Sequence, residues 1–199
     1  EEVAPPFTFT CGGRPAREVL AGWKIEKSRK ELDADRVSHA LAWTDPGTKL
    51  SVSWEAIEYR DSPTIEWMLW FRNGGTADSP VLADIRPLDV RLARRPGDEF
   101  VLRHAKGTFV RRDDYEPLRT VLGPNESLRF APPGGRPCGW VFPYYNLQAG
   151  GEGIIAVVGW AGQWEARFER DADRGLRVAA GQETARFRLR PGEAARTPL

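Results

Sequence analysis

The stretch from Gly134 to Asp171 constrains the fold most, because an apolar run and an alternating run follow each other there. Ile154–Val158 is continuously apolar and bounded by glycines. It is too short to span a membrane, and it predicts a strand buried on both faces. After Gly162, every second residue from Trp164 to Phe168 is apolar, as in a half-exposed strand. We expect these two strands to form a hairpin through the core of a β-sandwich.

The same alternation runs through residues 36–88, interrupted by turn sequences rich in Asp, Asn, Pro and Gly. It predicts a meander of at least four antiparallel strands. In that meander, residues 81–88 are expected to pair with the strand that ends at Asn73. A strand is also favoured for residues 18–32, because Gly22 disfavours a helix.

No segment shows the apolar stripe of an amphipathic helix. The predicted fold class is therefore all-β, a large antiparallel β-sandwich of two sheets packed face to face. A length of 199 residues, with eight Trp and nine Phe, is enough for a single domain with a substantial core. Residues 1–199 are accordingly expected to form one sandwich domain.

The charge balance narrows the choice of partners. Charged residues make up 29% of the chain, but the formal net charge is only +1, which argues against a nucleic-acid-binding surface. We also expect no membrane partner, since there is no transmembrane run or signal peptide. The chain begins at Glu1 and is expected to be a mature form or a piece of a longer protein.

Candidates for metal binding and nucleophilic catalysis are few. Only two cysteines and two histidines occur, with no metal-ligand spacing. Cys11 and Cys138 permit one disulfide, although free thiols are the favoured interpretation. His39 lies on the apolar face of a predicted strand and is interpreted as a core residue, and His104 is interpreted as structural. No catalytic residue, metal or cofactor is therefore assigned to this chain.

Short motifs, in a fixed order along nearly the whole chain, resemble the N-terminal domain of glycoside hydrolase family 36. That family contains α-galactosidases and α-N-acetylgalactosaminidases. The segment from Gly159 to Trp164, Gly-Trp-Ala-Gly-Gln-Trp, carries the resemblance best. The other motifs are Gly22-Trp23, Thr44-Asp45-Pro46, Glu58-Tyr59-Arg60-Asp61, Glu66-Trp67, His104-Ala105-Lys106-Gly107, Pro117-Leu118, Gly134-Gly135-Arg136 and Pro143-Tyr144-Tyr145-Asn146-Leu147.

The resemblance implies a galactose-mutarotase-like supersandwich and a parent enzyme that is a retaining α-galactosidase without metal or cofactor. The two catalytic carboxylates of such an enzyme lie in a (β/α)₈ barrel, and the barrel's motifs do not occur here. The chain alone is therefore expected to be inactive. Its implied partners are its own C-terminal catalytic barrel and α-galactoside-type glycans, with homo-oligomers left open.

The resemblance also implies candidate site residues, because loops of this domain approach the barrel's active-site mouth in the family. An exposed Trp beside an Arg suits a sugar, which stacks on an aromatic face and hydrogen-bonds at its rim. The substrate-proximal residues are Gly135, Arg136, Cys138, Trp140, Asp113, Asp114 and Tyr115.

Two alternatives stay open: an independent carbohydrate-binding module that uses Trp140 as a stacking surface, and a structural sandwich without a ligand. Sugar titration of the chain alone would separate these two. Export to the periplasm or cell exterior is favoured over the cytoplasm only because glycan-degrading enzymes are often exported. The sequence does not identify the sugar, since specificity would lie mostly in the barrel.

Overall fold

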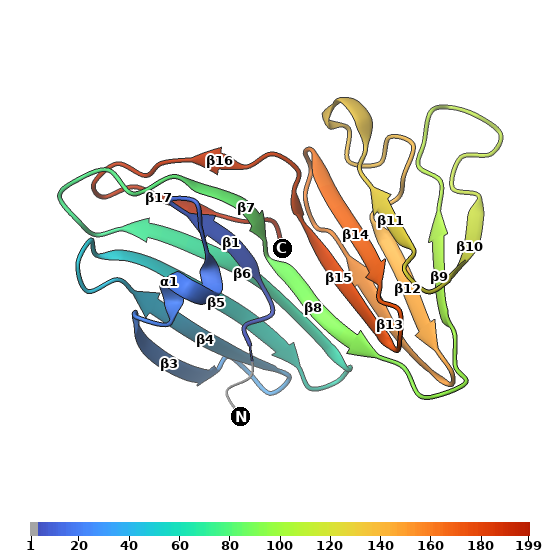
Figure 1. The fold of residues 1–199 in the computed structure, drawn as a ribbon, viewed down its shortest axis with the longest axis horizontal. Coiled ribbons are helices and arrows are strands. Elements are labelled where there is room, and N and C mark those ends of the chain that lie inside the picture. Colours follow the sequence, from blue (N-terminus) through green and yellow to red (C-terminus); the bar gives the residue numbers. More distant parts are fainter. Residues whose placement is uncertain (1–3) are drawn as a thin grey trace. The chain divides into compact units, whose positions relative to one another are not determined.

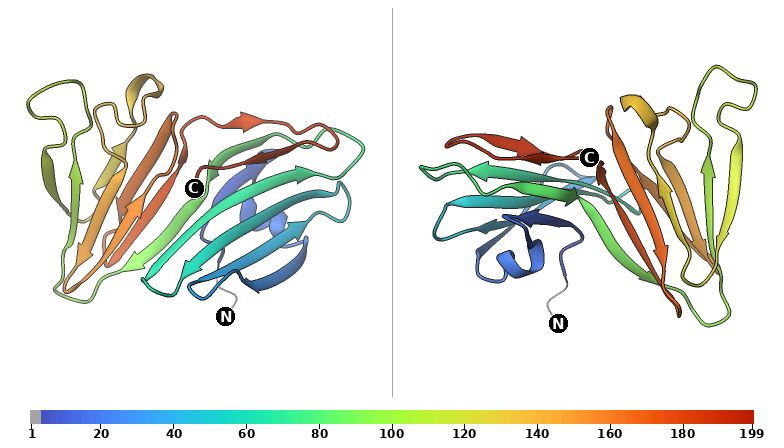
Figure 2. Two further views of the ribbon diagram at one scale, coloured as in Figure 1. Left: turned by 180° about the vertical axis from the view of Figure 1, so that it is seen from behind. Right: turned by 45° about the horizontal axis from the view of Figure 1, so that its top comes forward.

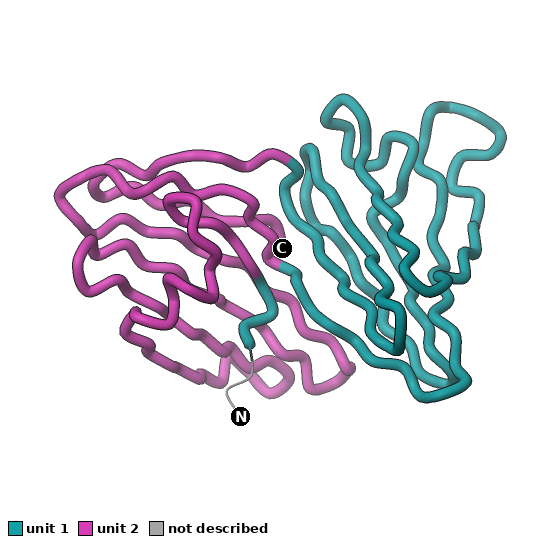
Figure 3. The backbone as a smooth tube through the Cα atoms, in the orientation of Figure 1, with its two compact units in different colours: residues 1–7, 88–183 teal, residues 8–87, 184–199 magenta. Residues whose placement is uncertain are grey.

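A computed structural model describes residues 4–199 as an antiparallel β-protein with one short α-helix (Figure 1). The all-β sandwich prediction is confirmed, with the strands distributed over four antiparallel sheets. The chain divides into two compact units (Figure 3). Unit 2 comprises Thr8–Pro87 and Thr184–Leu199, and unit 1 comprises Leu88–Glu183 with the described residues before Thr8. The expectation that residues 1–199 form one domain is not tested by this division and stays a prediction.

The larger sheet of unit 2 contains the predicted meander. Its strand order is β17-β6-β5-β4-β3. Asp45 closes the β4–β5 turn by accepting hydrogen bonds from Gly47 N (3.1 Å) and Thr48 Oγ1 (2.6 Å). The strands are β3 (Lys24–Glu31), β4 (Arg36–Thr44), β5 (Leu50–Tyr59), β6 (Thr64–Asn73) and β17 (Ala194–Arg196).

The smaller sheet of unit 2 corrects one predicted pairing. Its order is β16-β7-β1-β2, with β1 (Thr8–Cys11), β2 (Arg14–Pro15), β7 (Leu82–Arg86) and β16 (Arg186–Phe187). Strand β7, predicted to pair with β6, pairs with β1 and β16 instead. The place beside β6 is taken by β17, from the far end of the chain. Local sequence cannot reveal this long-range competition.

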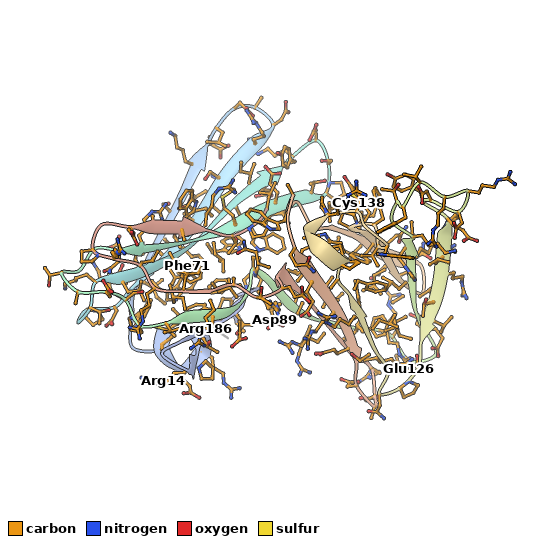
Figure 4. All side chains as sticks on the ribbon, turned by 90° about the horizontal axis from the view of Figure 1, so that it is seen from above. Arg14, Phe71, Asp89, Glu126, Cys138 and Arg186 are labelled. Atoms are coloured by element: carbon orange, nitrogen blue, oxygen red, sulfur yellow. The ribbon has the colours of Figure 1, made fainter. Side chains whose placement is uncertain are left out.

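Aromatic contacts join the two sheets of unit 2. Phe71 of β6 meets Phe9 of β1 edge to face at 5.3 Å and Phe187 of β16 at 6.3 Å (Figure 4 labels Phe71). Edge-to-face pairs of this kind favour a specific packing of the two layers. The strand predicted over residues 18–32 begins only at Lys24, because Ala16–Leu20 forms helix α1, which ends just before Gly22.

His39 does not occupy the core position expected of it. It lies on β4 with its side chain about a third exposed, and its Nε2 is 2.7 Å from Glu58 Oε2. The diagonal position of Glu58 on the neighbouring strand β5 supplies this partner.

Unit 1 is a second two-sheet sandwich. One sheet has the order β10-β9-β12-β13 and the other β11-β14-β15-β8. Between them lies a core built around Tyr145, Trp164 and Phe168, with Tyr145 5.1 Å from Phe168 and 6.3 Å from Trp164. The elements are β8 (Leu88–Ala93), β9 (Phe100–Ala105), β10 (Pro117–Leu122), β11 (Ser127–Phe130), the 3₁₀ helix η1 (Pro133–Gly135), β12 (Tyr144–Ala149), β13 (Glu152–Val157), β14 (Trp164–Arg170) and β15 (Gly175–Gln182).

The prediction for the apolar run 154–158 is wrong in two respects. Ile155 is 71% exposed and Ile154 50% exposed, so β13 is not buried on both faces. Strand β13 pairs with β12, whereas β14 pairs with β11 and β15, so the two strands form no hairpin. An apolar run does not distinguish an edge strand from a central one, and β13 is an edge strand of its sheet.

The alternating run after Gly162 forms the predicted strand, and Trp164 and Phe168 are fully buried in the core of unit 1. It is not half-exposed as predicted, because β14 is an inner strand and Glu165 on its other face is only 2% exposed. Strand β10 begins at Pro117, although residues 113–118 have the composition of a loop. Over residues 4–199, no helix is long and apolar enough to cross a membrane.

Candidate functional site

Two loops meet at one end of unit 1, and together they carry every predicted site residue. The 106–116 loop joins β9 to β10, and the 131–143 loop, which contains η1, joins β11 to β12 (Figures 1 and 2). The first holds Asp113, Asp114 and Tyr115, and the second holds Gly135, Arg136, Cys138 and Trp140. The structure thus brings two groups of residues, distant in sequence, to the same end of one sandwich.

Backbone hydrogen bonds fasten the two loops to each other. Thr108 N donates to Cys138 O at 2.7 Å, and Phe142 N donates to Ala105 O at 3.2 Å. Lys106 and Val141 form an isolated antiparallel bridge between these contacts. The loops therefore extend the pairing of their parent sheet beyond the ends of the regular strands.

Gly107 permits this close approach. A β-carbon at Gly107 would lie 2.0 Å from Cys138 O, 2.6 Å from Val141 N and 2.8 Å from Trp140 N. All three contacts are to backbone atoms, which cannot move aside as a flexible side chain can. The glycine of the His104-Ala-Lys-Gly107 motif is therefore required by the loop contact. His104 itself donates to or accepts from Thr120 Oγ1 at 3.1 Å and packs on Phe130, as a structural residue does.

Asp114 organises the 106–116 loop from within. Its carboxylate accepts hydrogen bonds from Thr108 Oγ1 (2.7 Å), Phe109 N (2.8 Å) and Val110 N (2.8 Å). These bonds favour the ionised form and lower the pKa of Asp114, the bond from Thr108 most of all. Both oxygen atoms of the Asp114 carboxylate therefore already accept hydrogen bonds from groups of the same loop.

Asp113 is paired with a lysine. Lys106 Nζ lies 2.8 Å from Asp113 Oδ2 and 2.5 Å from Glu116 Oε2. The hydrogen bond to Lys106 lowers the pKa of Asp113, and the same bond raises the pKa of Lys106. Both predicted acidic residues therefore have structural partners, and their contact with a substrate stays a prediction.

Trp140 lies in a stack of exposed side chains that we call the stacking platform: Phe109, Arg111 and Trp140. The Phe109 and Trp140 rings are 4.5 Å apart, and the Arg111 guanidinium carbon is 4.9 Å from the Trp140 ring. Trp140 is nevertheless 48% exposed. A cation over an indole is electrostatically attracted to its face, so the platform is held together without being covered.

The backbone of both loops adopts a conformation that non-glycine residues rarely take. Trp140 has a φ of 63°, and Val110 and Tyr115 each have a φ of 61°. Val110, between the two platform residues of its loop, is 94% exposed. Such strained positions concentrate at functional sites, where the surrounding structure maintains them.

The remaining predicted residues flank the platform. Tyr115 meets Phe142 edge to face at 5.4 Å, and Phe142 stacks on Tyr144 at 4.8 Å. Cys138, labelled in Figure 4, is a half-buried free thiol in the segment after η1. Arg136 directly follows η1 and is exposed.

Sequence reasoning missed three residues of this site. Phe109 and Arg111 were not among the predicted site residues, and Gly107 was named only as the end of the His104-Ala-Lys-Gly107 motif. The available signal was the closeness of Phe109 and Arg111 in the segment after Gly107, but only the fold reveals that this loop faces Trp140. Across the described chain, no group of three or more His, Cys, Asp or Glu side chains is arranged to hold a metal ion.

Several solved structures with a similar fold are described as α-galactosidases. The α-galactosidase from Lactobacillus brevis superposes with a TM-score of 0.74 at 15% identity, over 100% of this chain and 28% of that one. The family 36 α-galactosidase AgaA from Geobacillus stearothermophilus gives 0.72 at 17% identity, over 100% of this chain and 29% of that one. No protein-family model matches the sequence, and no curated protein sequence matches it significantly.

The resemblance to glycoside hydrolase family 36 is confirmed at the level of the fold. A third structure, the galactosidase domain of the α-galactosidase–sucrose kinase AgaSK, gives a TM-score of 0.68 at 16% identity. It is matched over 99% of this chain and 29% of that one. The chain therefore spans less than a third of the length of the α-galactosidases it resembles.

Proposed function

We propose that this chain is the N-terminal accessory domain of a retaining α-galactosidase-like glycoside hydrolase. It packs on the catalytic barrel of a longer protein, and the 106–116 and 131–143 loops shape the entrance for the substrate. The observation that carries the proposal is the stacking platform, displayed on a fold that occupies 28–29% of known α-galactosidase chains. The barrel and the α-galactoside glycan are the partners this role implies, and a homo-oligomer stays open.

The chemistry of the platform supports a sugar as its ligand. The apolar C–H face of a pyranose packs against an indole, and charged donors at the rim bind its hydroxyl groups. Trp140 offers exposed indole surface, and Arg111 and Arg136 bring guanidinium donors to the same two loops. Galactose, with one apolar face, suits such a platform.

The proposed role assigns chemistry to the barrel and not to this chain. A retaining glycosidase needs two carboxyl groups about 5 Å apart on opposite sides of the scissile bond. The two candidate acids here, Asp113 and Asp114, are instead held by Lys106 and by backbone N–H groups of their own loop. The proposed function therefore needs no cofactor or metal within this chain.

Replacing the platform's indole tests the proposal. In the longer protein, Trp140→Ala is expected to raise KM for raffinose about 3- to 10-fold with kcat little changed, as the loss of about 0.5–1.5 kcal/mol of aromatic contact predicts. The matched control is Trp70→Ala, because Trp70 is also stacked by an arginine, with Arg72 at 4.7 Å. An unchanged KM in W140A would contradict a substrate role for this loop.

The platform also favours one alternative, an independent carbohydrate-binding module. In that case the isolated chain binds sugar without a barrel. Calorimetric titration of the chain with galactose and raffinose distinguishes the two: binding lost in W140A favours the module, and no heat in either protein favours the accessory domain.

A further inference from the structure

The motif from Gly159 to Trp164 is not explained by the platform, although it lies beside it in the fold. It connects β13 to β14. Its Gln163 side chain makes hydrogen bonds to three groups in two segments of unit 1, the 131–143 loop and the residue that follows β15. Gln163 Oε1 accepts from Gly135 N at 2.7 Å, and Nε2 donates to Glu183 Oε2 at 2.7 Å and to Pro132 O.

These three partners fix the orientation of the amide. A backbone N–H can only donate, so Gln163 Oε1 must face Gly135. A backbone carbonyl and a carboxylate can only accept, so Nε2 must face Pro132 O and Glu183. Only a side chain with one acceptor and two donors at its tip satisfies this set. The isosteric glutamate fails it, because its ionised carboxylate donates no hydrogen bond.

Trp164 holds the same loop a few residues further on. Its indole is fully buried, and Nε1 donates to Pro137 O at 2.8 Å. Gly162 makes room for the other indole of the motif, since a β-carbon there would lie 2.7 Å from Trp160 Nε1. Two successive side chains thus bind the 131–143 loop at Pro132, Gly135 and Pro137, immediately before the residues that carry the platform.

Glu183 is itself anchored. Arg129 forms ion pairs with Glu183 and with Glu165, the latter at 2.5 Å, and Glu165 is only 2% exposed. Arg167 adds a second bond to Glu165 at 2.7 Å. Glu183, the partner of Gln163, therefore belongs to a charged network on β11, β14 and the end of β15. This network fixes the position of Glu183 and so helps to orient the Gln163 amide toward the loop.

We infer that Gln163 and Trp164 are positioning residues that hold the 131–143 loop in the conformation that presents Trp140. The inference deepens the proposed function and rests on it for the identity of what Trp140 meets. We call the segment Gly159–Trp164 the clamp. In it Trp160 packs beside Gly162, Gln163 hydrogen-bonds to Pro132 and Gly135 around η1, and Trp164 is buried in the core while it hydrogen-bonds to Pro137.

Gln163→Glu tests the clamp with almost no change of shape. It places a carboxylate against Glu183 and Pro132 O, so the hydrogen bonds that Gln163 donates to these two groups are lost and the two carboxylates repel each other. The readout is the rate at which a maleimide labels Cys138, which lies in the loop and is half-buried. Labelling is expected to rise at least about five-fold. Cys11, buried in unit 2, reports the folding of that unit and is expected to keep its rate.

Exchanging the two side chains provides a rescue. In Gln163→Glu/Glu183→Gln the new amide donates to the new carboxylate, so Cys138 labelling should fall toward the wild-type rate. Glu183→Gln alone is the matched control for loss of the Arg129 pair. Hydrogen exchange of a peptide covering residues 131–142 is expected to follow the same order. A wild-type labelling rate and wild-type exchange in Q163E would overturn the inference.

The same variants separate the clamp from the proposed function. In the longer protein, Q163E is expected to raise KM for raffinose with kcat nearly unchanged, and the exchanged pair to restore it. If Q163E loosens the loop while neither Q163E nor W140A changes KM, the clamp stands and the proposed substrate role fails. If W140A raises KM but Q163E neither loosens the loop nor changes KM, the clamp fails and the substrate role stands.

Discussion

Gly107 lies so close to Cys138 that a β-carbon on the glycine would come within 2.0 Å of the Cys138 carbonyl oxygen. This contact lies where the two loops that carry all predicted site residues are hydrogen-bonded to each other. It also explains why a glycine ends the His104-Ala-Lys-Gly107 motif, where the sequence alone indicates only a turn. The platform depends on it, because Phe109 and Trp140 follow the contact by two residues on each side.

Adding a methyl group at this contact should separate the loops. Gly107→Ala is expected to destabilise the protein by about 1–3 kcal/mol, because backbone atoms must shift to admit the β-carbon. Urea unfolding followed by tryptophan fluorescence measures the loss. Gly151→Ala is the matched control, since a β-carbon at Gly151 meets nothing within 4 Å. Equal stability of the two variants would mean that the loop contact is looser than described.

The buried carboxylate of Glu165 should matter far more than an exposed one. Glu165 pairs with Arg129 and Arg167 at 2.5 and 2.7 Å, and its side chain is 2% exposed. Glu165→Ala leaves both guanidinium groups without this partner and is expected to cost about 1–3 kcal/mol. Glu152→Ala breaks the Arg95 pair, in which both side chains are 78% exposed, and should cost under about 1 kcal/mol.

His104 should make the protein less stable in mild acid. Burial lowers the pKa of His104 below its ordinary value of about 6.5, so the unfolded chain binds the proton more readily. The stability that the protein gains by keeping His104 neutral is fully present above about pH 6.5. It is lost as the pH falls toward the lowered folded-state pKa. Asp113 and Asp114 also have lowered pKa values, but they lose their contribution only below about pH 4.

Urea unfolding at pH 7.5 and pH 5.5 tests whether His104 lowers the stability of the protein in acid. The wild-type protein is expected to lose more stability between the two pH values than His104→Gln, whose amide can still bond Thr120. Loss of the same size in both proteins would exclude His104 as the source.

The two thiols should react at very different rates. Both cysteines are free, with Cys138 half-buried and Cys11 only 7% exposed. Burial raises the pKa of the Cys11 thiol and so reduces its reactive thiolate. Without reductant, Ellman's reagent is expected to count two thiols in denaturant and one fast thiol in the native protein. Cys138→Ser should remove the fast phase, and fewer than two thiols in denaturant would indicate a disulfide.

Much of the fold follows from local pattern. The alternation in residues 36–73 predicts β4, β5 and β6 because each of these strands pairs with its neighbour in sequence. Pairings between distant segments escape this logic: β17 takes the edge beside β6, and β7 joins β1. The run Ile154–Val158 was wrongly predicted to be buried on both faces, because apolar residues occur both in the centre of a sheet and on its exposed edge.

The site was predictable only in part, for a similar reason. Trp140 and the acidic residues 113–114 could be named from residue type, loop composition and family resemblance. Their partners could not, because Arg111 stacks on Trp140 across a separation of 29 positions and Gln163 reaches Gly135 across 28. Contacts between loops depend on how the strands beneath them pair, and that information is not local.

The most direct test of the account is α-galactosidase activity on a chromogenic α-galactoside, measured for this 199-residue chain and for the longer protein that contains it. The account predicts turnover by the longer protein and none by the chain alone. Turnover by the chain alone, or by neither protein, would contradict it.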